Sequence, residues 1–166
     1  STLMDGGAYL GWGVVVMFYC AAMLHLPYKV PNVRFYGKRV FTNKPTCGAM
    51  RGLGGVQPRI AVETALDEIA LNMGMSPHEL RWKNAVESGH TTASNMFVRH
   101  SEYKKCLDDV VKRTGYLERR GTLPFGRGIG LAGGHYSSGT AYTLYLSYKP
   151  HCDALIRVDP ESGVSV

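Results

Sequence analysis

The chain of 166 residues predicts an α+β fold in which helices pack on a mixed or antiparallel sheet. Two observations lead to this prediction. In the first part of the chain, apolar residues recur mainly at helical spacing, with one strand-like stretch between the helices. From Arg127 onward the pattern is strand-like, and residues 140–148 and 154–158 are the clearest strands. We therefore expect two regions, residues 1–118 and a β-rich segment over residues 119–166.

The first two helices are expected from their apolar patterns. Residues 13–26 form an apolar run that predicts a buried helix and is too short to span a bilayer. Residues 56–73 place their apolar side chains on one broad face, and Gly74 follows as a stop signal. Between these helices, residues 33–42 alternate as a strand, in which the glycine at position 37 permits a bulge or turn.

Local capping signals predict two more helices. Ser76-Pro77-His78-Glu79 matches a capping box with proline at the first helical position, so a helix is expected from Pro77 to about Val86. Ser101 is expected to cap another helix, which ends before Gly115. The polar residues 87–100 predict a loop between these two helices.

The end of the chain resembles a hairpin whose second strand stops early. Residues 154–166 contain two short strand-like stretches, and residues 119–126 before the β-rich part form a basic, exposed connector. The first residues are apolar as well. Natural domains usually end in polar, loosely held residues, so we expect an internal portion of a larger protein.

Charge and cysteine usage restrict the classes of function. The net charge is +6, but the lysines and arginines are scattered, which favours a small anionic ligand over nucleic acid. The four cysteines are widely separated, so no zinc site or iron-sulfur cluster is expected within this chain. Without a recognisable signal peptide, free thiols and a cytoplasmic location are the expectation.

The strongest candidate for a site is the glycine-rich stretch from Thr42 to Pro58. Four glycines surround Arg51 immediately before a helix signal. Glycine lets the backbone approach a ligand closely, arginine supplies a fork of donors, and the start of a helix carries unpaired N–H groups. The pattern therefore indicates a loop that binds an anion, and an ordinary turn between a strand and a helix is the alternative.

Other candidate sites have simpler interpretations. The stretch 128–133 matches G-x-G-x-x-G but precedes β-rich sequence, so we expect a glycine-rich strand that packs closely, not a dinucleotide site. The pairs His135-Tyr136 and His151-Cys152 are expected to be neighbours by chance, and His25 is expected to be a satisfied core residue.

The acidic residues do not form a recognisable catalytic pair. Glu63, Asp67 and Glu68 are expected to lie on the solvated face of the helix over residues 56–73. Asp5 stands alone before two glycines. A general base, if the parent protein uses one, is therefore expected outside this chain.

An ordered series of motifs resembles the large, molybdopterin-binding subunit of the xanthine oxidase family of molybdenum hydroxylases. The motifs are Asp5-Gly6-Gly7-Ala8-Tyr9, Tyr28-Lys29-Val30-Pro31-Asn32-Val33, Thr42-Asn43, Met50-Arg51-Gly52-Leu53-Gly54-Gly55-Val56-Gln57-Pro58, Leu66-Asp67-Glu68-Ile69-Ala70 and Glu79-Leu80-Arg81-Trp82-Lys83-Asn84. The resemblance covers nearly the whole chain. It implies part of a molybdopterin-binding domain, with the family's essential glutamate lying beyond Val166.

The resemblance also implies roles for residues of the glycine-rich loop. Arg51 matches the family's arginine beside molybdenum and is the implied catalytic residue. The implied cofactor-binding residues are Met50, Arg51, Gly52, Gly54 and Gly55. The cofactor would be molybdenum-molybdopterin in its cytosine dinucleotide form. Iron-sulfur clusters and FAD would be carried by an iron-sulfur subunit and a flavin subunit of the same complex.

Three positions narrow the implied subfamily. Xanthine oxidases carry phenylalanine where this chain has Leu53, and a substrate-binding arginine where it has Tyr19. Carbon monoxide dehydrogenases carry cysteine where it has Gly52. The remaining motifs are most similar to 4-hydroxybenzoyl-CoA reductase, which implies reductive removal of an aromatic hydroxyl in aromatic degradation.

In that interpretation Tyr19, Cys47 and Leu53 shape the pocket for an aromatic acyl-CoA. A related dehydrogenase for aldehydes or N-heterocycles, including xanthine-like substrates, is the second hypothesis. A non-enzymatic, anion-binding α+β module is the third. The last hypothesis rests on the positive charge and on the missing base.

Overall fold

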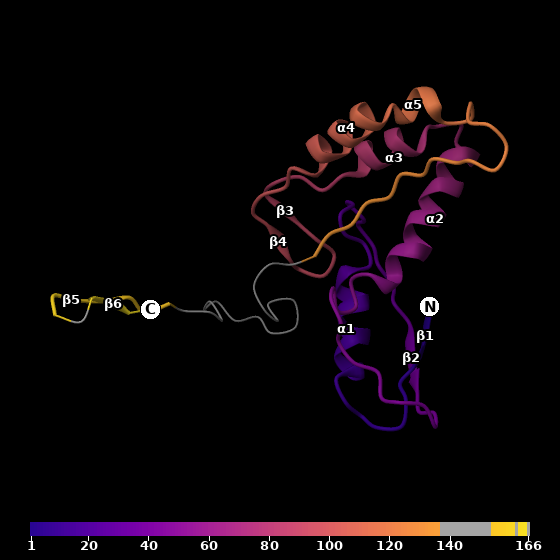
Figure 1. Ribbon diagram of the computed structural model, residues 1–166. Helices are drawn as coiled ribbons and strands as arrows, with labels where there is room; N and C mark the ends of the chain where they lie inside the picture. Colours follow the sequence, from indigo (N-terminus) through magenta and orange to yellow (C-terminus); the bar gives the residue numbers. More distant parts are fainter. Residues whose placement is uncertain (137–153, 162, 166) are drawn as a thin grey trace. The chain divides into compact units, whose positions relative to one another are not determined.

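The computed structural model describes residues 1–136, 154–161 and 163–165 (Figure 1). The chain divides into two units, residues 1–136 and residues 137–166. The predicted α+β fold class is confirmed, and the described strands pair two by two. The predicted division of the chain after residue 118 stays a prediction. No helix among the described residues is long and apolar enough to cross a membrane.

The first unit begins with a strand, a helix and a second strand. β1 (Thr2–Asp5) pairs in parallel with β2 (Gly37–Val40), and α1 (Gly13–Met23) connects them. α1 confirms the predicted buried helix, since Val16 and Met23 are among its buried residues. The predicted strand over residues 33–42 was too long, because only the four residues of β2 find partners along the four-residue β1.

α2 (Gln57–Asn72) and α3 (Pro77–Asn84) confirm the next two predicted helices. The Ser76 hydroxyl accepts a hydrogen bond from the Glu79 amide at 3.1 Å, as the capping box predicts. The apolar face of α2 is only partly covered by the first unit: Ile60 is 79% exposed and Met73 is 61% exposed. Part of this face lines a groove of about 580 Å³ beside residues 24–34.

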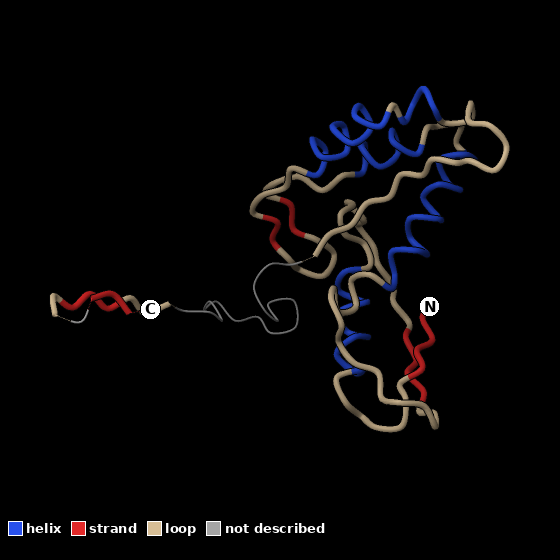
Figure 2. Tube along the Cα trace, viewed as in Figure 1, coloured by secondary structure: helices blue, strands red, loops and turns tan. Residues whose placement is uncertain are grey.

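The stretch predicted as a loop before the fourth helix contains a small hairpin. β3 (His90–Thr91) pairs antiparallel with β4 (Phe97–Val98), as Figure 2 shows. The prediction failed because a polar side chain and the backbone close the turn together: the Thr92 hydroxyl accepts from the Met96 amide, and the Thr92 carbonyl accepts from the Asn95 amide. Polar turn residues thus stabilise a hairpin that the composition does not reveal.

α4 (Tyr103–Thr114) and α5 (Tyr116–Arg119) are separated by Gly115, whose φ of 60° allows the helix to end there as predicted. The predicted cap was wrong. The Ser101 hydroxyl donates to the Val86 carbonyl instead, and α4 begins after Glu102 without a side-chain cap.

Residues 127–136 return along α4 toward α1 (Figure 1). They form no strand, contrary to the prediction. Instead of pairing with another strand, this segment is held by apolar packing and by single hydrogen bonds. Leu131 packs in a cluster with Leu107, Val111 and Tyr116.

The second unit contains β5 (Arg157–Asp159) and β6 (Gly163–Ser165), which pair antiparallel and confirm the predicted hairpin. The predicted strand over residues 140–148 lies outside the described residues, as do His151 and Cys152.

Candidate cofactor-binding loop

The glycine-rich loop between β2 and α2 has an unusual backbone. Arg51 has a φ of 89°, and Gly52 and Gly54 have φ values of 73° and 68°. Glycine adopts such values freely, whereas a residue with a Cβ is strained there by about 1–2 kcal/mol. Strain of this kind persists only where surrounding structure enforces it, and it is concentrated at functional sites.

The loop lies directly on α1. A Cβ on Gly54 would stand 2.5 Å from the Val16 carbonyl oxygen and 2.5 Å from the Tyr19 Cβ, so only glycine fits this contact. The Gly52 carbonyl accepts from the Gly55 amide at 2.9 Å and closes a tight turn before α2. The structure therefore brings Tyr19 and the glycine-rich loop together, although 33 positions separate residues 19 and 52.

The loop presents donors that have no acceptor among the described residues. The Arg51 side chain is exposed and forms no hydrogen bond or ion pair with any described residue. The same holds for the backbone amides of residues 48–54, while Met50 is 90% exposed. A free guanidinium beside a row of free amides is a chemical match for an anionic group.

Cys47 lies at the start of α1. Its amide donates to the Gly6 carbonyl at 3.3 Å, and its Sγ lies where a side chain on Gly13 would have to stand. The half-buried Cys47 thiol is thus held against the helix start. Cys20, Cys47 and Cys106 are free thiols, and no cluster of histidine, cysteine and acidic side chains among the described residues could hold a metal ion.

Asp5 fixes the segment that leads into the loop. Its carboxylate accepts from Lys44 Nζ at 2.7 Å, from the Thr42 hydroxyl at 2.5 Å and from the Gly7 amide at 3.1 Å. The hydrogen bond from Lys44, followed by those from Thr42 and Gly7, lowers the pKa of Asp5 to about 2. Asp5 is therefore a structural anchor.

We expect the anchoring by Asp5 to depend on pH. Because the folded pKa lies below the ordinary value of 3.8, the stabilisation is complete above that value and is lost as the pH falls toward about 2. Replacing Lys44 by alanine should raise the pKa of Asp5 toward 3.8, measured by the carboxyl carbon shift in an NMR titration. The variant Lys105→Ala removes another exposed lysine and should leave the titration unchanged.

Tyr136 completes the site and was missed by the sequence interpretation. Its hydroxyl donates to the Leu53 carbonyl at 3.2 Å, and its ring stacks on Tyr19 with centroids 6.1 Å apart and planes 8° apart. Tyr19 is consequently only 7% exposed. The sequence His135-Tyr136 does not predict these contacts with Leu53 and Tyr19. The contacts depend on how residues 127–136 return to α1.

Arg59, in the first turn of α2, was also missed. Its guanidinium donates to the carbonyls of Met23 at 2.6 Å and Leu24 at 2.5 Å, and also to the Leu26 carbonyl. These carbonyls lie at the end of α1 and directly after it, where the last backbone acceptors of a helix lack i+4 partners. Arg59 therefore ties the beginning of α2 to the end of α1, with the glycine-rich loop directly before it.

Glu63 was predicted to be solvated, and this prediction was wrong. Glu63 is 7% exposed because α3 and the segment 127–136 cover this side of α2. Its carboxylate accepts from Arg81 Nε at 2.9 Å, from the Tyr28 hydroxyl and from the Gly133 amide at 2.8 Å. Arg81 is itself fully buried. Of the three acidic residues predicted on this face, only Glu68 is exposed.

His25 is buried, as predicted, but it is only partly satisfied. Its Nε2 lies 3.4 Å from the Ser94 hydroxyl, whereas its Nδ1 has no partner among the described residues. Burial lowers the pKa of His25, and Arg59 and His90 act in the same direction. A neutral imidazole at this position is compatible with the largely apolar surroundings.

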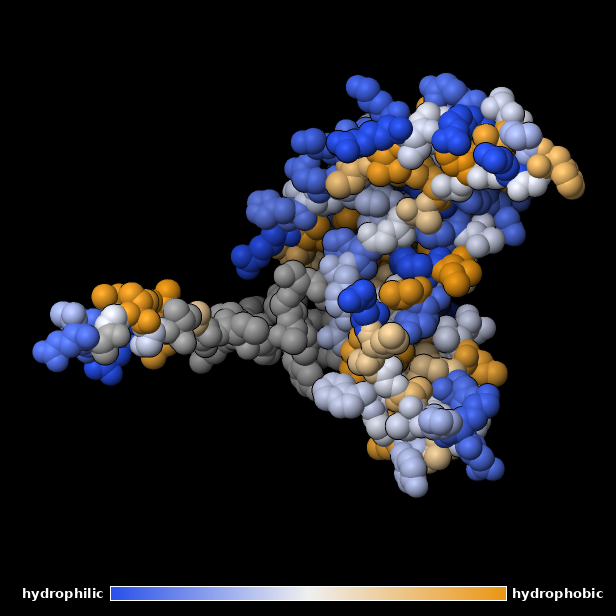
Figure 3. Space-filling view, viewed as in Figure 1, coloured by the Kyte–Doolittle hydropathy of each residue, from blue (hydrophilic) through white to orange (hydrophobic). Residues whose placement is uncertain are grey.

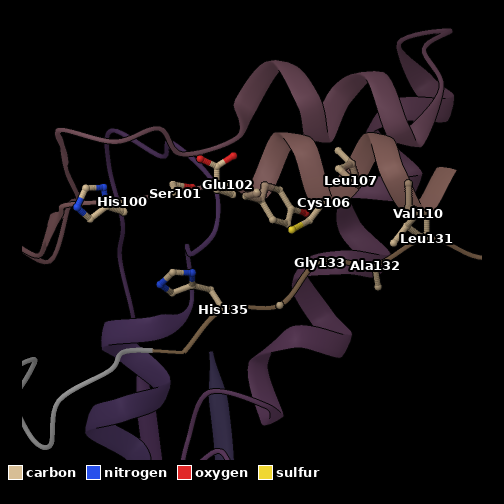
Figure 4. Close-up of a pocket in the computed structure, with 12 residues that line it drawn as sticks. His100, Ser101, Glu102, Cys106, Leu107, Val110, Leu131, Ala132, Gly133 and His135 are labelled. Atoms are coloured by element: carbon tan, nitrogen blue, oxygen red, sulfur yellow. The ribbon is translucent and has the colours of Figure 1, made fainter. Parts of the chain in front are cut away.

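A second cavity of about 360 Å³ lies between α4 and the segment 127–136, and it includes no residue of the glycine-rich loop. Figure 4 shows His100 and Glu102 at one end of it and Leu131 at the other.

Around the loop itself, exposed apolar residues include Val56 and Ile60. Figure 3 shows apolar residues interspersed with hydrophilic ones on the surface of the first unit.

Comparisons with known proteins agree with this geometry. The family model of the molybdopterin cofactor-binding domain matches residues 1–85. Over 141 residues, 82% of this chain and 16% of the relative, the sequence is 32% identical to the aldehyde oxidoreductase of Megalodesulfovibrio gigas. Over 153 residues, 80% of this chain and 20% of the relative, it is 33% identical to a probable xanthine dehydrogenase of Bacillus subtilis.

A solved structure shows the same fold. The aldehyde oxidoreductase from Desulfovibrio gigas superposes with a TM-score of 0.67 and 30% sequence identity, over 75% of this chain and 14% of that chain. This chain thus corresponds to a minor part of its relatives, and the match includes the strand, helix and loop that carry Arg51. The chain belongs to the molybdopterin cofactor-binding domain family and is homologous to the aldehyde oxidoreductases and xanthine dehydrogenases of the xanthine oxidase family.

Proposed function

We propose that the loop from Met50 to Gly55 forms one wall of a molybdenum-molybdopterin site. The observation that carries this proposal is the strained, exposed Arg51, whose guanidinium has no partner among the described residues. The backbone amides of residues 48–54, which have no acceptor in the described ranges of the chain, add further donors on the same loop. Together they match the negative charge of a molybdenum centre with its oxo, sulfido and dithiolene ligands.

Within this proposal Met50, Arg51, Gly52, Gly54 and Gly55 hold the cofactor. The bound group supplies the oxidation and reduction of the substrate. Arg51 contributes a fixed positive charge and several donors, which stabilise negative charge without reorganising during the reaction. Gly52 keeps a side chain away from the backbone beside Arg51, whereas the buried Gly54 and Gly55 allow the loop to pack closely on α1 and on Tyr136.

The same proposal assigns the substrate pocket to Tyr19, Cys47 and Leu53. Tyr19 supports the loop from α1 and Leu53 is half-buried within it, while Cys47 lies at the start of α1. None of the three carries an acidic or basic side chain. An apolar substrate, such as an aromatic ring, is therefore favoured at this wall.

We further propose that the complete protein is the catalytic subunit of a molybdenum hydroxylase-family oxidoreductase in the cytoplasm. The first candidate reaction is the reductive dehydroxylation of 4-hydroxybenzoyl-CoA, supported by the sequence motifs around Arg51. Electrons would come from iron-sulfur clusters and FAD on partner subunits, and the pterin would be the cytosine dinucleotide form. The second candidate is oxidation of an aldehyde or an N-heterocycle, which the names of the two relatives favour.

One experiment separates the two candidate reactions. The intact subunit is produced with its partner subunits, its molybdenum content is measured, and both reactions are assayed with the same preparation. Turnover of 4-hydroxybenzoyl-CoA with a reduced electron donor supports the first candidate. Oxidation of aldehydes or N-heterocycles without that turnover supports the second, and a folded complex without molybdenum contradicts both.

A further inference from the structure

The segment 131–136 is anchored by a buried carboxylate. The Gly133 amide donates to Glu63 Oε2 at 2.8 Å, and Arg81 holds the same oxygen at 2.9 Å. Gly133 also lies tightly against the hydroxyls of Tyr28 and Tyr103, where a Cβ has no room. The position of Gly133 is therefore determined by three neighbouring elements, α2, α3 and α4, and by the chain around Tyr28.

Three residues after this anchor, Tyr136 reaches the glycine-rich loop. Its hydroxyl binds the Leu53 carbonyl, and its ring covers Tyr19. A Cβ on Gly55 would stand 2.8 Å from the Tyr136 ring, so the loop and the ring are in close contact. The loop is thus enclosed between α1, which Gly54 touches, and Tyr136, which Gly55 touches.

This enclosure explains how Arg51 keeps a strained conformation. A strained φ such as the 89° of Arg51 persists only where surrounding structure holds it, and here the contacts hold the residues that follow Arg51. The turn closed by the Gly52 carbonyl and the Gly55 amide holds the loop only locally. Among the described residues, the bond from Tyr136 to the Leu53 carbonyl is the hydrogen bond that connects the middle of the loop to a distant segment, and it adds to the packing of Gly54 on α1.

We infer that Tyr136 is a positioning residue, which holds the Arg51 loop against α1 through its hydrogen bond to the Leu53 carbonyl and its stacking on Tyr19. The inference rests on the proposed role of the loop at the molybdenum site. Tyr136 does not need to touch the cofactor. It acts by keeping the guanidinium and the free amides in one arrangement, which lowers the cost of binding an anionic group.

The test uses hydrogen exchange of the intact subunit, followed by mass spectrometry of peptides covering residues 50–60. The variant Tyr136→Phe keeps the ring and loses the donor. We expect the Gly55 and Val56 amides, which donate to the Gly52 carbonyl, to exchange about three- to tenfold faster, the effect of removing one hydrogen bond. Tyr136→Ala, which also loses the stacking, should show a larger increase. Peptides from α3 and α4 should exchange at the same rate as in the unaltered protein. A general loss of structure would instead speed exchange in those helices too.

Two further measurements separate this inference from the proposed function. The control Tyr36→Phe removes a hydroxyl from a tyrosine that is 58% exposed, and it should leave exchange of the loop unchanged. The second measurement is the rate at which molybdenum is lost during prolonged dialysis of the unaltered protein and of Tyr136→Phe. The variant should lose molybdenum several-fold faster.

If no molybdenum is present in the unaltered protein, the proposed function fails while the exchange data still decide the role of Tyr136. If exchange of the loop in Tyr136→Phe matches that in Tyr36→Phe, Tyr136 does not position the loop and the inference is overturned. Faster exchange with unchanged molybdenum retention also overturns it, because the loop would then be mobile without consequence for binding.

Discussion

Replacing Glu63 by glutamine is expected to lower the free energy of unfolding by about 3–5 kcal/mol, the usual effect of removing one partner from a buried ion pair. The carboxylate is surrounded by donors from Arg81, Tyr28 and Gly133. The Arg81 side chain has no exposed surface. Burial alone would lower the pKa of Arg81, but hydrogen bonds to Glu63 and Asp67 raise it. The substitution therefore leaves a buried guanidinium that has lost one of its two carboxylate partners.

The stability of the Glu63→Gln variant is measured by urea unfolding of the intact subunit. Glu68→Gln, the same substitution on an exposed residue of α2, is the matched control and should change stability by at most about 0.5 kcal/mol. Combining Glu63→Gln with Arg81→Met removes both charges and should restore part of the loss. Equal effects of the Glu63 and Glu68 substitutions would show that the buried pair contributes nothing.

Replacing Arg51 by alanine is expected to reduce turnover by about 100- to 1,000-fold, the range seen when a preorganised donor is removed from an active site. Stability should hardly change, for two reasons. Alanine keeps the Cβ and hence the same backbone strain, and the Arg51 guanidinium forms no hydrogen bond with a described residue. Steady-state kinetics and urea unfolding of the intact enzyme measure the two quantities separately.

Two variants sharpen the test of Arg51. Arg51→Lys keeps a positive charge but loses the planar fork of donors, and it should recover only part of the activity. Arg99→Ala removes another exposed arginine, outside the loop, and should leave turnover unchanged. If Arg51→Ala turns over at the rate of Arg99→Ala, Arg51 has no role in the reaction.

Local patterns predicted the elements whose signals are contained within a few residues. The capping box at Ser76 and the glycine at position 115 correctly located the start of α3 and the end of α4. The hairpin near the end of the chain was predicted from alternation alone. The glycine-rich loop was recognised because glycines around an arginine before a helix are unusual chemistry for an ordinary turn.

Contacts between distant segments could not be predicted in the same way. Glu63 carries the same sequence signal as the exposed Glu68, and only the covering of α2 by α3 and the segment 127–136 distinguishes them. Ser101 was expected to cap α4, but its hydroxyl donates a hydrogen bond to the Val86 carbonyl instead. Tyr136 approaches Leu53 across 83 positions of sequence, and no local pattern encodes that contact.

By itself the sequence determined the helices, the family motifs and the position of Arg51 among its glycines, because helix propensity, capping and backbone freedom depend on near neighbours. The tertiary structure alone decided which charges are buried and which tyrosine supports the loop. Those outcomes depend on how segments far apart in the chain cover one another. Glu63 becomes desolvated, and Tyr136 reaches Tyr19, only when α1, α2 and the segment 127–136 pack together.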